Sequence, residues 1–256
     1  MNSDSNTKAH ETIVDLSRFL GSADRSLAIL AEGNTSLRLS NREFLVKASG
    51  AEMMACTSAD FVRIDLDRVL DAIASDEVGD EHVAGVLADA RLGGGSRASV
   101  ETMLHAVCLE YDQVAAVGHS HPVAVNSLLC STSAPLLTAG SLFPDQVVVL
   151  GRHRLMVEYT DPGLALARVV RRLLRDHVTA HGAVPKVIYL RNHGMFALGA
   201  SADEVKRITL MAEKCAQILL QASSSGEVVF LSESDARRID ERPDELFRRA
   251  LLSKPL

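Results

Sequence analysis

The chain has 256 residues, of which 47% are hydrophobic and 23% are charged, and its formal net charge is -6. A chain of this length can bury a substantial core without disulfides or structural metals. The acidic balance argues against nucleic-acid binding, and no apolar stretch approaches the ~20 residues that a membrane-spanning helix needs.

Apolar periodicity and turn residues predict a mixture of helices and strands. In the first half we expect a helix from about Glu11, a hairpin at 35–40 and 43–50, a strand and helix at 60–73, and a helix from Ser99 as its N-cap. A strand at 113–121 and a helix at 123–131 follow. In the second half we expect a strand at 146–151, a helix at 161–178 with Pro162 in its first turn, strands at 186–190 and 195–199, a helix at 201–222, and one charged helix with a tail at 232–256.

This order favours an α/β sandwich whose sheet is at least partly antiparallel over a doubly wound parallel sheet. Because no repeat or linker marks a boundary, we expect a single domain over 1–256, with its core at about 11–222. The four scattered cysteines are expected to be buried free thiols in a reducing compartment. The polar N-terminus lacks the pattern of a secretory signal, which predicts a cytoplasmic protein.

Three histidines supply the first candidate site. Alternate residues on a strand point to one face, so His119 and His121 in VGHSHP share a face with Cα atoms roughly 6.6 Å apart. That spacing permits both imidazoles to bind one metal ion, but it equally permits one exposed and one core histidine. His193, in the tight turn of RNHGMFALG, is the candidate third ligand, and Gly194 is expected to give that turn a positive φ.

A carboxylate and several turns could complete this site. Glu101 starts the helix before the His-x-His strand and is the candidate acid–base group, although a carboxylate there also suits the helix dipole. His105, one helical turn later on the same face, could support the site residues or pack in the core, and packing is favoured. Turns rich in glycine, hydroxyl and amide groups could bind an anion, although each alone is ordinary turn chemistry. They contain Asn34, Ser49, Gly50 and Ser99.

In this order, the segments GNTSLR, VKASG, SVETMLH, VGHSHP and RNHGMFALG resemble the class II aldolase/adducin family over about 11–222. The resemblance implies that His119, His121 and His193 bind a divalent metal, with Zn2+ expected and Mn2+, Co2+ or Fe2+ as alternatives. It assigns the acid–base role to Glu101, which can also touch the metal. The phosphate-binding positions that it implies are Asn34, Ser49, Gly50 and Ser99.

The resemblance further implies a three-layer α/β/α sandwich around a mainly antiparallel sheet, assembled as a homotetramer with the active site between subunits. The implied activity is retro-aldol cleavage of a ketose 1-phosphate or related sugar derivative through a metal-bound enediolate. Val100 stands where fuculose-phosphate aldolases carry a hydroxyl, and GSLFPDQVVVLG with VKASG is more similar to fused rhamnulose-phosphate aldolases. The substrate therefore stays open.

Two alternatives remain. A decarboxylase of a 3-oxo or aromatic acid, or a sugar-phosphate 4-epimerase, would use the same metal and an enolate, and its partner would also be a small molecule. The alternative from another class is a non-catalytic interaction domain like that of adducin, which would have the same fold but no activity. The three histidines and the glutamate favour an enzyme, because a scaffold has no need of them.

Overall fold

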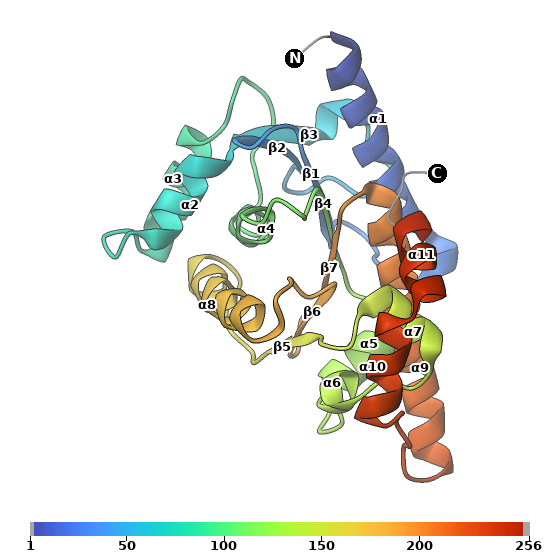
Figure 1. Cartoon of the computed structure of the whole chain (residues 1–256). Coiled ribbons are helices and arrows are strands. Elements are labelled where there is room, and N and C mark those ends of the chain that lie inside the picture. The colour runs from blue at the N-terminus through green and yellow to red at the C-terminus, as the bar shows by residue number, and fades with distance from the viewer. Residues whose placement is uncertain (1–2, 253–256) are drawn as a thin grey trace.

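The computed structural model describes residues 3–252, in which one seven-stranded sheet lies between two layers of helices (Figure 1). The strands are β1 (Asn34–Arg38), β2 (Glu43–Lys47), β3 (Phe61–Asp65), β4 (Ala116–Ser120), β5 (Leu155–Val157), β6 (Val187–Leu190) and β7 (Gly194–Gly199). Their order across the sheet is β3-β2-β1-β4-β7-β6-β5. Only the pair of β5 with β6 is parallel within this sheet, so the expected mainly antiparallel α/β/α architecture is confirmed.

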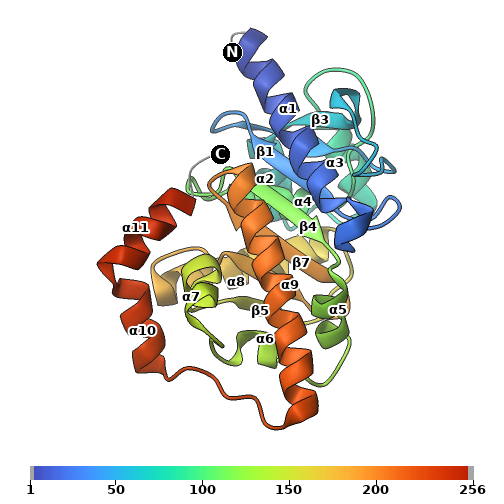
Figure 2. The same cartoon turned by 90° about the vertical axis from the view of Figure 1, so that its right-hand side faces the viewer.

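Helices cover both faces of the sheet. The longer ones are α1 (Ser3–Leu20), α2 (Leu66–Ala74), α3 (Val83–Asp89), α4 (Thr102–Leu109), α5 (Val123–Leu129), α7 (Pro144–Leu150), α8 (Leu164–His181), α9 (Ala202–Ser225), α10 (Glu233–Glu241) and α11 (Pro243–Leu252). Single turns form α6 (Leu136–Ala139), η1 (Ala23–Arg25), η2 (Ser58–Asp60) and η3 (Asp80–His82). Helices α2, α3, α4 and α8 cover one face, and α1, α5 and α9 cover the other (Figures 1 and 2).

Strand alternation explains the two cores. In β7, Phe196 and Leu198 join the apolar cluster that includes α4 and α8, whereas Met195 and Ala197 join the cluster that includes α5 and α9. Successive side chains of a strand point to opposite faces, so a strand with apolar residues at every position is buried on both sides. The layered fold therefore follows from the continuous apolar runs of the central strands.

The prediction of a strand at 146–151 is wrong, because this segment forms helix α7. Its three consecutive valines favour a strand by propensity. However, Pro144 stands in the first turn, where its fixed φ suits a helix, and Asp145 follows it there. The helix buries Val147 and Val148 against Ala236 and Ile239 of α10, so tertiary packing overrides the local preference.

Two predicted helix boundaries also need correction. Helix α4 begins at Thr102 with Glu101 as its N-cap residue, so Ser99 lies in the preceding turn and is not the N-cap. The predicted single helix at 232–256 is two helices, α10 and α11, and the tail at 253–256 lies outside the described residues. Arg242 between them is extended (φ -63°, ψ 132°), because a proline disfavours the helical conformation of the residue before it.

Smaller differences concern single residues. The first helix starts at Ser3, upstream of the expected Glu11, and Pro162 precedes α8, which begins after Gly163. Of the four cysteines, which are all free, Cys130 is exposed where a buried thiol was expected. The short elements β5 and α3 had no predicted counterpart. Within 3–252 no helix combines the length and the apolar character that crossing a bilayer demands.

The buried guanidinium of Arg154 ties the segment around α6 and α7 together. It is 6% exposed and donates to the carbonyls of Leu137, Gly140, Gly151 and Arg152 and to Ser141 Oγ. Replacing Arg154 by an apolar residue leaves these buried acceptors without a donor, and each unsatisfied acceptor lowers the free energy of unfolding. The irregular connections on either side of α7 therefore depend on one side chain.

We expect Arg154→Met to lower the free energy of unfolding by about 3 kcal/mol, as measured by urea denaturation. The control is Arg172→Met, an exposed arginine of α8, which should change it by no more than about 0.5 kcal/mol. Equal effects of the two substitutions would contradict the role given to Arg154.

Candidate metal and acid–base site

The pairing of β4 with β7 brings two distant histidine segments together. His119 lies opposite Phe196, and Ser120 lies opposite Met195. The 191–193 turn just before β7 therefore reaches the end of β4, where His121 follows the strand and donates its backbone N–H to Leu27 O at 2.8 Å. Histidines 74 positions apart in the chain become neighbours through strand pairing alone.

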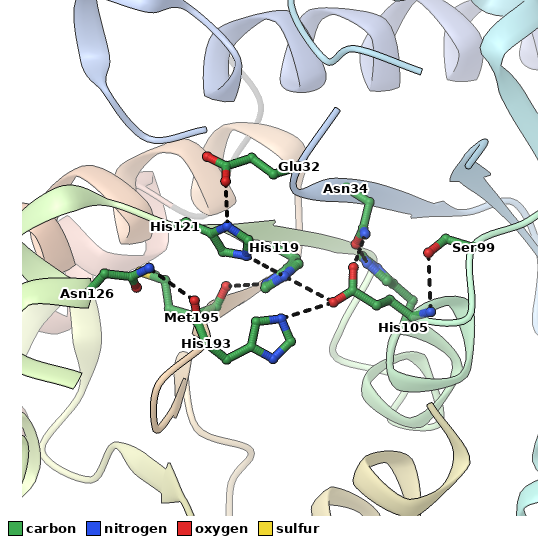
Figure 3. A network of polar contacts seen from close by, with 10 residues as sticks. Glu32, Asn34, Ser99, His105, His119, His121, Asn126, His193 and Met195 are labelled. Atoms are coloured by element: carbon green, nitrogen blue, oxygen red, sulfur yellow. Dashed lines mark hydrogen bonds and ion pairs between the residues drawn. The ribbon is translucent and has the colours of Figure 1, made fainter. Parts of the chain in front are cut away.

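The three imidazoles converge with a carboxylate (Figure 3). One nitrogen from each of His119, His121 and His193 lies within 4.8 Å of the others. His119 Nε2 is 3.1 Å from His121 Nε2, and Glu101 Oε1 is 3.3 Å from His119 Nε2 and 3.1 Å from His193 Nε2. The structure thus assembles all three histidines and the glutamate that the sequence singles out.

Hydrogen bonds at the far nitrogens orient two of the rings. His119 Nδ1 is 3.0 Å from the carbonyl oxygen of Met195, and His121 Nδ1 is 2.9 Å from Glu32 Oε2. Both partners are acceptors, so each Nδ1 carries the proton and each neutral ring directs the lone pair of Nε2 into the cluster. Facing lone pairs beside a carboxylate repel one another unless a cation lies between them. The donor set therefore fits a divalent metal such as zinc.

Glu101 is held as a carboxylate at the start of α4. Burial by itself would raise its pKa, but when His119 and His193 carry protons on Nε2, their charges and hydrogen bonds outweigh burial and place the pKa of Glu101 below its usual range. Asn34 Nδ2 donates to the other oxygen, Oε2, at 2.5 Å. Burial and the nearby His119 also lower the pKa of His121, against the raising effect of Glu32. These shifts favour the metal-binding forms of both groups.

The turn that carries His193 differs from the sequence-based expectation. The positive φ of 54° belongs to Asn192, and Gly194 does not adopt one. Gly194 is required by space, because a Cβ there would collide with His121 Cδ2 and lie 2.7 Å from the carbonyl oxygen of Ser120. Asn126 Nδ2 donates to the carbonyl of His193 at 3.0 Å and holds the turn against α5.

The candidate anion-binding turns lie beside the N-terminal end of α4. Ser49 donates its backbone N–H to Arg97 O at 2.9 Å, which places the exposed Ser49–Gly50 turn next to the loop of Ser99. Gly50 has a φ of +79° and open space at its Cβ position. Ser99 Oγ accepts from the backbone N–H of Glu101 at 3.4 Å. Their role with a phosphate stays a prediction.

Sequence reasoning missed two contributors to this site, Glu32 and Asn126, and favoured packing for a third, His105. Glu32 stands two residues before Asn34 in the segment AEGNTS, and its distance from His121 in the chain hides their contact. Asn126 had no signal beyond its polarity in an apolar helix. His105 does pack in the core, at 5.3 Å between its ring centroid and that of Phe196, but it also hydrogen-bonds to Ser36 and Asn34.

The chain belongs to the family described as the Class II Aldolase and Adducin N-terminal domain, whose model matches residues 11–220. This family match confirms the resemblance stated from the motifs. It also agrees with the layered fold described above.

Individual relatives and solved structures are similar to this chain at low sequence identity. A curated relative, "Uncharacterized oxidoreductase YuxG" of Bacillus subtilis (strain 168), is 24% identical over 79% of this chain. The chain spans 28% of that relative's length. The N-terminal class II aldolase domain of a conserved protein from Thermoplasma acidophilum is 27% identical, with a TM-score of 0.65 over 82% of this chain and 93% of its own. The L-fuculose-1-phosphate aldolase from Thermus thermophilus is 20% identical, with a TM-score of 0.61 over 87% of this chain and 100% of its own.

We expect Gly194→Ala to displace His121 and to weaken zinc binding by about 10-fold or more, because ligand orientation sets metal affinity. Titration against a competing chelator measures this. Gly85→Ala is the control, since nothing lies within 4 Å of the added Cβ in helix α3. Zinc affinity in Gly194→Ala equal to that of the wild type would contradict the steric argument.

Proposed function

We propose that this protein is a divalent-metal-dependent lyase that cleaves a ketose 1-phosphate or related sugar derivative by retro-aldol chemistry. The observation that carries the proposal is the convergence of three imidazole nitrogens, which lie within 4.8 Å of one another, with a Glu101 oxygen that is 3.3 Å and 3.1 Å from two of them. Membership of the class II aldolase family supports the same reaction class. A scaffold without catalysis would gain nothing from buried, mutually repelling donors.

His119, His121 and His193 would hold the metal, with zinc favoured by three nitrogen donors and Mn2+, Co2+ or Fe2+ as alternatives. Such an ion, when bound, supplies Lewis-acid polarisation of a carbonyl oxygen. Glu32 and the carbonyl of Met195 orient two of the rings through their Nδ1–H groups. The protein thereby fixes the direction of the donors before any ion arrives.

Glu101 would carry the proton. As a carboxylate it accepts the proton of the hydroxyl on the carbon that becomes the aldehyde, while the carbon–carbon bond breaks. It then returns that proton to the carbon that keeps the electron pair. Its Oε1 faces His119 and His193, so the proton carrier and the polarising site would act on neighbouring atoms of one substrate.

The substrate's phosphate would lie against Ser49, Gly50 and Ser99, with Asn34 nearby. The open Cβ space and positive φ of Gly50 support this, because such turns present backbone N–H groups to anions. The placement of the 49–50 turn beside the Ser99 loop supports one shared pocket. These turns and Glu101 flank the same end of α4.

We also propose that the chain forms one domain and assembles as a homotetramer with its active site between subunits. Ile29, Leu30 and Val123 are 62%, 78% and 60% exposed. They adjoin the His121 segment, because Leu27 accepts the His121 backbone N–H. Exposed apolar side chains beside a site support a protein contact there.

We expect purified wild-type protein to contain about one divalent ion per chain, as counted by elemental mass spectrometry, and His121→Ala to lose it. His153→Ala is the control, because His153 lies outside the cluster and should leave the metal content unchanged. Absence of metal from the wild type, even after reconstitution, would remove the basis of the lyase proposal.

We expect Glu101→Gln to keep the metal and to lower kcat by about 10²- to 10⁴-fold, because glutamine cannot accept the proton. The assay panel contains ketose 1-phosphates and 3-oxo acids, so that a decarboxylase or epimerase would reveal itself by its products. The exposed Glu227→Gln should match the wild type. Normal turnover by Glu101→Gln would show that another group moves the proton.

A further inference from the structure

A buried chain of hydrogen bonds leads from the sheet to Glu101. Ser36 Oγ is 2.7 Å from His105 Nδ1. His105 Nε2 in turn bonds to Asn34 Oδ1, and both residues are drawn in Figure 3. Asn34 Nδ2 then donates to Glu101 Oε2 at 2.5 Å. The chain thus joins β1 to the N-terminal end of α4 through side chains alone.

The direction of every bond in this chain is fixed. An ionised Glu101 only accepts, so the amide of Asn34 must turn its nitrogen toward Glu101 and its oxygen toward His105. That oxygen also only accepts, so His105 must carry its proton on Nε2. The remaining nitrogen, Nδ1, then accepts the hydroxyl proton of Ser36.

The surroundings hold this arrangement rigid. Ser36 and His105 are 0% exposed and Asn34 is 4% exposed, so water does not compete for their polar atoms. Burial, with a smaller contribution from His119, lowers the pKa of His105 to about 3, which keeps the ring neutral. Phe196 packs against both the His105 and the His119 rings, with centroid distances of 5.3 Å and 4.3 Å.

We propose that His105 is a positioning residue whose Nε2–H fixes the Asn34 amide, so that Asn34 holds Glu101 Oε2 and leaves Oε1 directed at the histidine cluster. This inference rests on the proposed role of Glu101 as the proton carrier. It also gives the Asn34 side chain a different partner from the phosphate that the family resemblance implies. In this structure both ends of that amide are occupied, by Glu101 and His105.

The tautomer of His105 can be measured without any substrate. In protein labelled with ¹⁵N in its imidazole rings, long-range ¹H–¹⁵N correlation spectra distinguish a protonated Nε2 from a protonated Nδ1. The His105 signal is identified by its loss in His105→Gln. We expect a proton on Nε2 and a bare Nδ1 from about pH 8 to about pH 5. An Nδ1–H tautomer, or a doubly protonated ring near neutral pH, would overturn the proposal.

Two substitutions separate positioning from packing. His105→Gln can place an amide N–H near the position of Nε2, whereas His105→Leu fills the space without a donor. We expect His105→Leu to lower kcat by about 10- to 100-fold with little change in KM and metal content, and His105→Gln to recover most of that loss. Thr102→Val is the matched control, because it removes a buried hydroxyl without a partner one residue after Glu101.

Three results would contradict the positioning role. They are equal losses in both His105 variants, an unchanged kcat in His105→Leu, or a rise in KM alone, which would point to phosphate binding by Asn34. A wild type without metal or turnover would refute the proposed lyase function, and the tautomer measurement would still decide the direction of the hydrogen-bond chain.

Discussion

The antiparallel pairing of β4 with β7 is the constraint on which the site depends. Its register sets His119 opposite Phe196, so the turn before β7 must close beside the segment that follows β4. Both strands are buried on both faces, and a slip by one residue would turn each side chain to the wrong core. The hydrophobic pattern of two central strands therefore locates the histidines, although neither strand's apolar residues take part in the chemistry.

Electrostatics builds on that scaffold. Acceptors at Met195 and Glu32 hold the protons of two imidazoles outside the cluster, so their lone pairs face inward beside the Glu101 carboxylate. A free Asn34 amide or a protonated His105 would relax this arrangement. The buried bonds from Ser36 to Glu101 prevent both, because few competing donors or acceptors reach them. The orientation of Glu101 at the histidine cluster thus depends on the buried polar side chains of Ser36, Asn34 and His105.

Much of the fold was predictable, and the failures have physical causes. Hairpin β1–β2, strand β3 with helix α2, and strand β7 with helix α9 agree with the predicted segments, because each carries its own apolar period and turn residues. The prediction for helix α7 failed because three consecutive valines favour a strand locally, while the contacts with Ala236 and Ile239 that stabilise the helix come from a segment about 90 residues away. The break between α10 and α11 could have been predicted from Pro243, because a proline disfavours a helical residue before it. The continuous charged pattern on either side instead suggested one helix.

For the site, the sequence by itself determined which residues to consider. Histidine and glutamate side chains can bind metals and transfer protons, and turns and element ends are where binding and catalytic residues concentrate. It also determined the family, through motifs whose order is specific. Only the tertiary structure decided that Glu32 orients His121, that Asn34 turns toward Glu101, and that His105 joins them. These are contacts between residues 67 to 89 positions apart, and hydrogen-bond direction depends on atoms that meet only after folding.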